Sequence, residues 1–241
     1  MTATVLPRPR AATRAFAWSI ADAALLLSVP LMAWGLYRAL VVAPTEATLG
    51  DSQRIFYVHV PCAWAGFLGF LIVGGAGALY LATGREAFDR AAQAACEVGV
   101  LFTTLVLVTG PIWAKNDWGV YWTWDARLTS TFVLWLTYVG YLMIRINALD
   151  PGRIRRVLAI YGIVAFLDVP FVYYSIQWFR TQHPAPVIGA RGGGLAPEMR
   201  GALFTCGAAF LLLFAGLVAR RARLLRCEDE IQEMKAASRE S

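Results

Sequence analysis

The sequence is short of charged residues and lacks the motifs that mark the common soluble enzymes. Charged side chains make up 16% of the 241 residues, where a soluble domain has about 25%. No phosphate-binding GxxxxGK[ST] loop, no GxSxG nucleophile motif and no HExxH zinc motif occurs. These absences argue against a P-loop nucleotide hydrolase, an α/β-hydrolase and a zinc protease of the HExxH type.

Cysteine is also scarce. The four cysteines form no CxxC pair and no CxxCH heme-attachment motif, so the chain is not itself a c-type cytochrome; they are Cys62, Cys96, Cys206 and Cys227. Three of them lie in or beside apolar runs, where cysteine behaves as a small hydrophobic residue, and no disulfide framework is expected. No cleavage site clearly follows the first apolar run, which is therefore expected to remain as a membrane anchor.

Long apolar runs dominate the rest of the chain. Hydrophobic residues make up 58% of it, and a helix needs roughly 20 apolar residues to cross the hydrocarbon core. Six runs meet this length, near residues 19–42, 62–82, 94–113, 128–147, 155–175 and 200–219. We therefore predict an all-α integral membrane protein, a bundle of six transmembrane helices. One transmembrane domain is expected over residues 1–220, followed by a polar tail over 221–241.

The basic residues give this bundle an orientation. The net charge is +6, but Lys and Arg gather at the ends of the apolar runs and form no basic domain, so nucleic acid is not an expected partner. Fifteen of the 22 lie on one side of the predicted spans and six on the other, with Arg38 inside the first span. By the positive-inside rule the richer side, which includes both termini, is cytoplasmic. In a bacterial inner membrane the other three loops would face the periplasm.

Aromatic residues concentrate in the second of these outer loops, over about residues 114–130. Together with Trp113, the last residue of the preceding apolar run, four tryptophans and a tyrosine lie within twelve residues: Trp113, Trp118, Tyr121, Trp122 and Trp124. An aromatic belt at the membrane surface explains one or two of them, but this density favours a platform for a flat, apolar ligand. Arg127 could pair with a carboxylate of that ligand, whereas Asp125 stands where the N-cap of the fourth span is expected.

The chain has only two histidines, His59 and His183, and both are predicted to lie in outer loops. A single histidine at such a position is usually only a polar loop residue. Two on the same side, one before and one after the aromatic segment, fit another role better. A neutral imidazole is a good axial ligand for heme iron, and two of them complete a six-coordinate site. The spacing of the two residues does not show whether they converge.

One acidic residue falls inside a predicted span. Asp168 belongs to the fifth apolar run and is followed two positions later by Pro170. Because proline removes a helical hydrogen bond, we expect an irregularity in this helix that neighbouring helices satisfy. A proton relay is the alternative.

The run Trp118-Gly-x-x-Trp122-x-Trp124-Asp125 resembles the tryptophan-rich signature of the WWD family of heme-handling membrane proteins. Its continuation, Ala-Arg-Leu-Thr-Ser over residues 126–130, is similar to the CcmC branch of that family, which serves cytochrome c maturation. Two further segments carry the same resemblance: Tyr57-Val-His59-Val-Pro61-x-x-Trp64, and Asp168-Val-Pro170 with Ser175-x-x-Trp178-x-x-Thr-x-His183. The similarity extends over nearly the whole chain in length, number of spans and order of motifs.

The resemblance implies a membrane platform that presents heme b at the periplasmic face. His59 and His183 would be the axial ligands of the iron, and the macrocycle would be held by Trp118, Tyr121, Trp122, Trp124, Asp125 and Arg127. The implied partners are the heme chaperone CcmE, which receives the heme and becomes covalently attached to it, and the ATPase CcmA with CcmB and CcmD in a membrane complex. We expect a heme-binding and transfer component rather than a classical enzyme with a turnover site, and a lyase-like role in heme attachment stays open.

Three positions depart from the family pattern. Tyr121, Phe179 and Pro184 stand where relatives often have Trp, Trp and Gln, which changes details of binding but removes no ligand. Two alternative functions are open. A CcsA-like cytochrome c synthase component is disfavoured by the Ala126-Arg127 continuation and the short length. The permease subunit of an ABC heme exporter would predict more ionisable residues inside the spans.

Overall fold

The computed structural model describes residues 19–148, 150–179, 182–183 and 194–240. Within these residues the regular structure is helical, apart from one isolated bridge between Glu46 and Gly50. The helices are α1 (Ile20–Tyr37), α2 (Phe56–Thr83), α3 (Glu86–Trp118), α4 (Ala126–Ile146), α5 (Pro151–Phe166), α6 (Asp168–Trp178) and α7 (Pro197–Glu240). A π-helical turn (Arg38–Val42) follows α1, and a 3₁₀ helix (Asp51–Ile55) precedes α2. The prediction of an all-α protein is confirmed.

Six helical segments in the described part of the chain are long and apolar enough to cross a membrane. They are Ile20–Val42, Asp51–Thr83, Glu86–Trp118, Ala126–Ile146, Gly152–Trp178 and Pro197–Arg239. The fifth combines α5 and α6, and the sixth is α7. Each contains most of one predicted apolar run, so the prediction of six spans is confirmed.

Helix α2 begins earlier than hydropathy predicts. The second span was expected from residue 62, which left His59 in a loop. That placement of His59 is wrong, because α2 begins at Phe56. The 3₁₀ helix over Asp51–Ile55 runs directly into α2, so the backbone is already helical in polar residues that precede the apolar run. In the same way α3 continues to Trp118, and the first part of the predicted aromatic loop is helical.

The fifth span is interrupted where the sequence predicted an irregularity. α5 ends at Phe166, and α6 begins at Asp168 after a turn at Leu167. Pro170 explains the break, because it has no N–H to donate to the carbonyl of Phe166 and its ring would clash with that group in a continuous helix. The expected helix irregularity is confirmed.

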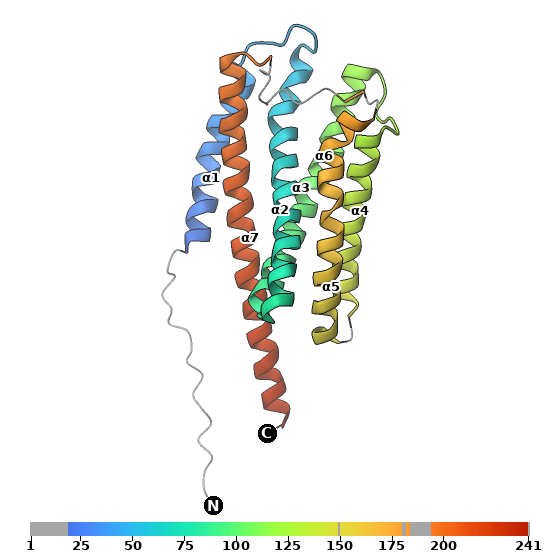
Figure 1. The fold of residues 1–241 in the computed structure, drawn as a ribbon. Helices are drawn as coiled ribbons and strands as arrows, with labels where there is room; N and C mark the ends of the chain where they lie inside the picture. The colour runs from blue at the N-terminus through green and yellow to red at the C-terminus, as the bar shows by residue number, and fades with distance from the viewer. Residues whose placement is uncertain (1–18, 149, 180–181, 184–193, 241) are drawn as a thin grey trace, which may run out of the picture.

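Helices α2 and α3 form the centre of the bundle (Figure 1). Helix α1 packs along α7 on one side of them, and α4, α5 and α6 lie on the other. The two central helices approach closely because glycines meet at their contact: a Cβ added to Gly69 would lie 2.9 Å from the Cα of Gly99. On the side of α4, the ring of Phe70 stacks on that of Tyr138 with centroids 3.7 Å apart. The core therefore lies along α2.

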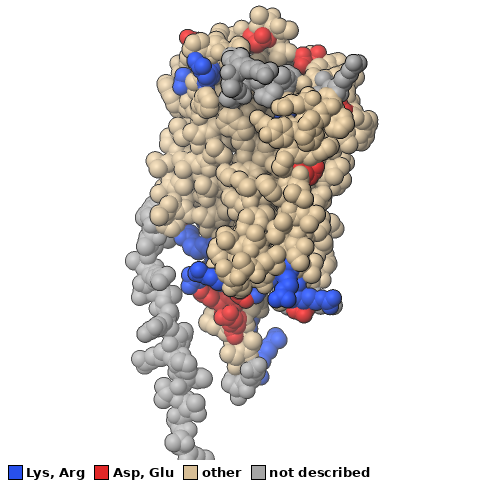
Figure 2. All heavy atoms as spheres, in the orientation of Figure 1, with Lys and Arg blue, Asp and Glu red and all other residues tan. Residues whose placement is uncertain are grey.

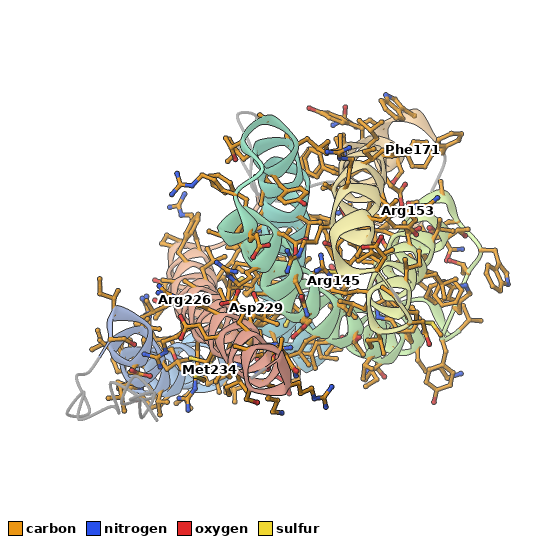
Figure 3. The ribbon with its side chains drawn as sticks, turned by 90° about the horizontal axis from the view of Figure 1, so that it is seen from below. Arg145, Arg153, Phe171, Arg226, Asp229 and Met234 are labelled. Carbon is orange, nitrogen blue, oxygen red and sulfur yellow. The ribbon has the colours of Figure 1, made fainter. Side chains whose placement is uncertain are left out.

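Ion pairs gather at one end of the bundle, the lower end in Figures 1 and 2. The Arg145 guanidinium of α4 lies 2.6 Å from the Asp89 carboxylate of α3, and both side chains are largely buried. Arg221 of α7 donates to Glu97 of α3 at 2.5 Å. Figure 2 shows basic and acidic side chains at this end, below a broad belt of other residues, and Figure 3 looks onto the same end, with Arg145 labelled. We call it the charged end.

Helix α7 is longer than the sixth apolar run. It continues through the polar residues after Arg220 to Glu240 and extends past the other helices at the charged end (Figure 1). Arg90 of α3 pairs with Asp229 at 2.9 Å, so the beginning of this extension still contacts the bundle. The sequence predicted a polar tail here but left its conformation open.

Candidate functional site

A cavity opens between α2, α3, α4 and α6 near the end of the bundle opposite the charged end. It has about 1180 Å³ of space free of protein atoms, part of it open to solvent. The start of α2, the end of α3 and the start of α4 meet there (Figure 1). Most of its lining is aliphatic or aromatic, including Phe67, Val106 and Leu107, and a few polar groups stand among these side chains. The arrangement is typical of a site for a largely apolar ligand.

His59 lies in the first turns of α2 and lines this cavity. The residue is only 9% exposed. Its Nδ1 is 2.9 Å from the hydroxyl oxygen of Thr109 on α3, and the edge of its ring meets Trp113 with centroids 5.9 Å apart. The ring is therefore held between a hydrogen bond and an aromatic contact, both supplied by the neighbouring helix.

His183 lines the same cavity. It lies beyond the end of α6, partly exposed, and its ring meets that of Trp118 edge to face at 6.3 Å. Pro184, which the sequence also singled out, is outside the described residues. The packing of α2, α3 and α6 thus brings together two histidines that are far apart in the chain, which the sequence could not establish.

The aromatic segment contributes unequally to the cavity. Trp118 and Trp122 line it, whereas Tyr121 and Trp124 do not. Tyr121 is 62% exposed, with the Lys115 ammonium 5.4 Å from its ring centroid. Trp124 is 77% exposed and meets Trp122 edge to face at 5.8 Å. Two of these aromatic side chains therefore face the interior, and two lie at the surface.

A turn at Gly119 separates Trp118 on α3 from the two tryptophans that follow it. Gly119 caps α3 with φ +75°, a left-handed conformation that favours glycine. The Lys115 ammonium donates to its carbonyl oxygen at 2.8 Å. The chain thus leaves α3 directly after Trp118, and the segment from 120 to 125 connects α3 to the first turn of α4.

Asp125 and Arg127 both lie at the start of α4 but have different structural roles. The Asp125 side chain accepts from the Leu128 N–H at 2.9 Å, which confirms the predicted N-cap. Arg127 is partly buried and lines the cavity. The cap fixes the helix that carries Arg127, so Asp125 supports the site without lining it.

Several residues at the cavity were not singled out from the sequence as site residues, among them Gly110 and Tyr173, which line it, and Thr109, which contacts His59. Thr109 lies one helical turn before Trp113, so the two share a face of α3. The sequence signal that could have identified Thr109 is a polar residue inside an apolar run, one helical turn before Trp113. No comparable signal marked Tyr173, which reaches the cavity only because α6 packs against α4.

Two buried donors in the cavity lining have no partner among the described residues. They are the indole N–H groups of Trp113 and Trp122. A buried polar group without a partner is costly, so these donors fit a ligand that brings its own acceptors. The described residues contain no cluster of three or more His, Cys, Asp or Glu side chains that could hold a bare metal ion. Two imidazoles, apolar walls and one guanidinium instead suit a metal carried in a flat organic macrocycle with acidic groups.

Comparison with known proteins agrees with this chemistry. A family model for heme exporter protein C, CcmC, matches residues 4–237. Heme exporter protein C of Bradyrhizobium diazoefficiens is 35% identical over 99% of this chain and 86% of its own length. The Escherichia coli K12 protein of the same name is 34% identical over 83% of this chain and 81% of its own length. A putative ccmC-like mitochondrial cytochrome c biosynthesis protein of Marchantia polymorpha is 33% identical over 76% and 78%. This chain belongs to the heme exporter protein C family.

Proposed function

We propose that this protein binds heme b in the cavity, with His59 and His183 as axial ligands of the iron, and promotes its transfer to the chaperone CcmE during c-type cytochrome biogenesis. Family membership supports a role in the heme export and cytochrome c maturation system. The observation that carries the site is that the chain's only two histidines line one apolar cavity. Because a pair of imidazoles completes six-coordinate iron, this convergence favours heme over an apolar ligand without a metal.

The histidines, Arg127, the two indole N–H groups and the apolar walls of the lining have distinct roles in this proposal. The imidazoles of His59 and His183 bind iron, and the apolar walls cover the faces of the macrocycle. Arg127 pairs with a propionate carboxylate, and the indole N–H groups of Trp113 and Trp122 donate to the acidic edge. Heme supplies the iron and the covalent chemistry of its attachment, while the protein supplies binding and orientation.

The residues of the aromatic segment outside the cavity act through their neighbours. Trp124 packs on the edge of Trp122 and holds that indole in place. Asp125 caps the helix that carries Arg127. Tyr121 and Trp124 are also exposed outside the cavity, where a heme acceptor would approach. These residues support binding without forming the pocket itself.

The location of the cavity supports a periplasmic site in a bacterial inner membrane. The cavity lies opposite the charged end, which carries basic groups on α3, α4, α5 and α7. By the positive-inside rule that end is cytoplasmic, as are both termini. CcmA, as an ATPase, would act from the cytoplasmic side, in a membrane complex with CcmB, CcmD and this chain.

Heme content and acceptor loading test the proposal together. Membranes containing CcmE and equal amounts of each variant are assayed for heme bound to the purified chain and for heme covalently attached to CcmE. We expect His59→Ala/His183→Ala to lose both, because the iron has no protein ligand left. Trp34→Ala, on the exposed face of α1, is the control and should retain both. Wild-type heme content and CcmE loading in the double variant would contradict the proposal.

A further inference from the structure

The two ring nitrogens of His59 have different surroundings. Nδ1 lies 2.9 Å from Thr109 Oγ1. The hydroxyl of Thr109 has a single hydrogen, and it donates that hydrogen to the carbonyl oxygen of Leu105, one turn earlier on α3, at 2.7 Å. The hydroxyl oxygen is then left to accept from His59. On this bonding pattern Nδ1 carries the imidazole proton, and Nε2 has a free lone pair.

Other threonines of the bundle make the same bond to their own helix. Thr103, Thr104 and Thr137 each donate to the carbonyl four residues earlier, at 2.8 Å. This local bond is a general preference of threonine inside helices. Thr109 follows the pattern and differs in having an imidazole nitrogen within hydrogen-bond distance of its oxygen. Because the Thr109 hydroxyl hydrogen is used in this bond within its own helix, the Thr109 oxygen acts as the acceptor toward His59.

The rest of the His59 environment holds the ring in this orientation. Trp113, one turn after Thr109 on α3, meets the ring at its edge. Gly110, which lies between Thr109 and Trp113 in the sequence, leaves room for the His59 ring, because a Cβ at position 110 would lie 3.3 Å from His59 Cε1. Rotating the ring by half a turn would remove Nδ1 from Thr109 and leave a buried N–H without its acceptor, which is costly. Three residues of one helical turn thus define the orientation.

We propose that Thr109 is a positioning residue that fixes the tautomer of His59, so that Nδ1 is protonated and Nε2 is available to bind iron. The tautomer is a property of the protein alone; its use in ligation rests on the proposed function. Metal-binding histidines commonly donate their second N–H to a neighbouring acceptor, which orients the ring and makes the ligating nitrogen more basic. Thr109 supplies such an acceptor in this site.

The first test needs no heme. The protein is labelled with ¹⁵N-histidine and purified heme-free, and the nitrogen chemical shifts are read by NMR, with His183→Ala used to assign the two rings. We expect His59 to have a protonated Nδ1 and an unprotonated Nε2. Thr109→Val, which keeps the shape but removes the hydroxyl, should move the population toward the Nε2–H tautomer. A wild-type His59 with its proton on Nε2 would overturn the proposal.

The second test measures the heme complex. Loss of the acceptor should lower heme affinity by roughly 10-fold or more, as the loss of such partners does at other metal sites. It should also raise the reduction potential, because a less basic imidazole stabilises oxidised iron less well. Thr109→Ser should restore both values toward wild type. Thr137→Val is the matched control, since that hydroxyl makes the same bond within its helix, and it should change neither value.

The two tests separate this proposal from the proposed function. If Thr109→Val keeps the wild-type His59 tautomer, heme affinity and reduction potential, Thr109 has no positioning role, even if heme binds normally. Failure of the wild-type protein to bind heme would contradict the proposed function. The NMR result would still decide whether Thr109 sets the tautomer.

Discussion

Two neighbouring tryptophans should respond differently to alanine substitution. Trp122 lines the cavity and is partly buried, whereas Trp124 is 77% exposed and lies outside it. Removing a large buried aromatic contact costs about 1–3 kcal/mol, which lowers affinity by roughly 5- to 150-fold. Trp124→Ala removes only an edge contact to Trp122. Such contacts are worth about 0.5–1.5 kcal/mol when buried and less at an exposed position, so affinity should fall by less than about 10-fold.

The assay is a heme titration of heme-free protein in detergent at equal concentrations of each variant. Trp34→Ala is the matched control, because Trp34 is 55% exposed on α1 and does not line the cavity. We expect the affinity loss to follow the order Trp122, then Trp124, then Trp34, with the heme of every variant still low-spin because both histidines remain. A loss for Trp124→Ala equal to or larger than that for Trp122→Ala would refute the cavity as the heme site.

Three further changes test other parts of the account. Asp125→Asn should leave thermal stability nearly unchanged, whereas Asp125→Ala should lower the free energy of unfolding by about 1 kcal/mol. Equal stability of the two variants would argue against the N-cap. Gly110→Ala would place a Cβ 3.3 Å from His59 Cε1, so it should lower heme affinity while leaving the helix content, measured by circular dichroism, unchanged. An unchanged heme affinity would contradict the contact between Gly110 and the His59 ring. Alkaline phosphatase should be active when fused after Asp117 and inactive when fused after Gly152; the reverse pattern would invert the topology.

The number and approximate positions of the spans could be predicted from the sequence because hydrophobic length decides membrane crossing. Two local features were predictable for equally direct reasons. Asp125 is a good N-cap residue placed just before an apolar run, and Pro170 has no N–H to donate to the carbonyl of Phe166 at the end of α5. The start of α2 was not predictable from hydropathy, since its first turns and the preceding 3₁₀ helix contain polar residues.

The composition of the cavity depended on packing that no local pattern encodes. His59 and His183 share it because α2 and α6 are both brought near α3 and α4, which is a property of the whole bundle. The separation of Trp122 from Trp124 depends on the path of the residues that connect the turn at Gly119 to α4. The contact between His59 and Thr109 links two helices, and only their register brings the two side chains together.

Axial ligation by both histidines is the central claim, and electron paramagnetic resonance with absorption spectroscopy tests it most directly. Heme-loaded wild-type protein, His59→Ala and His183→Ala are purified in the same detergent and compared in the ferric state. We predict a low-spin, six-coordinate spectrum for wild type, a high-spin spectrum for each single variant, and a return to low spin when imidazole is added. An unchanged low-spin spectrum in either variant, without added imidazole, would show that the substituted histidine is not a ligand and would contradict the account.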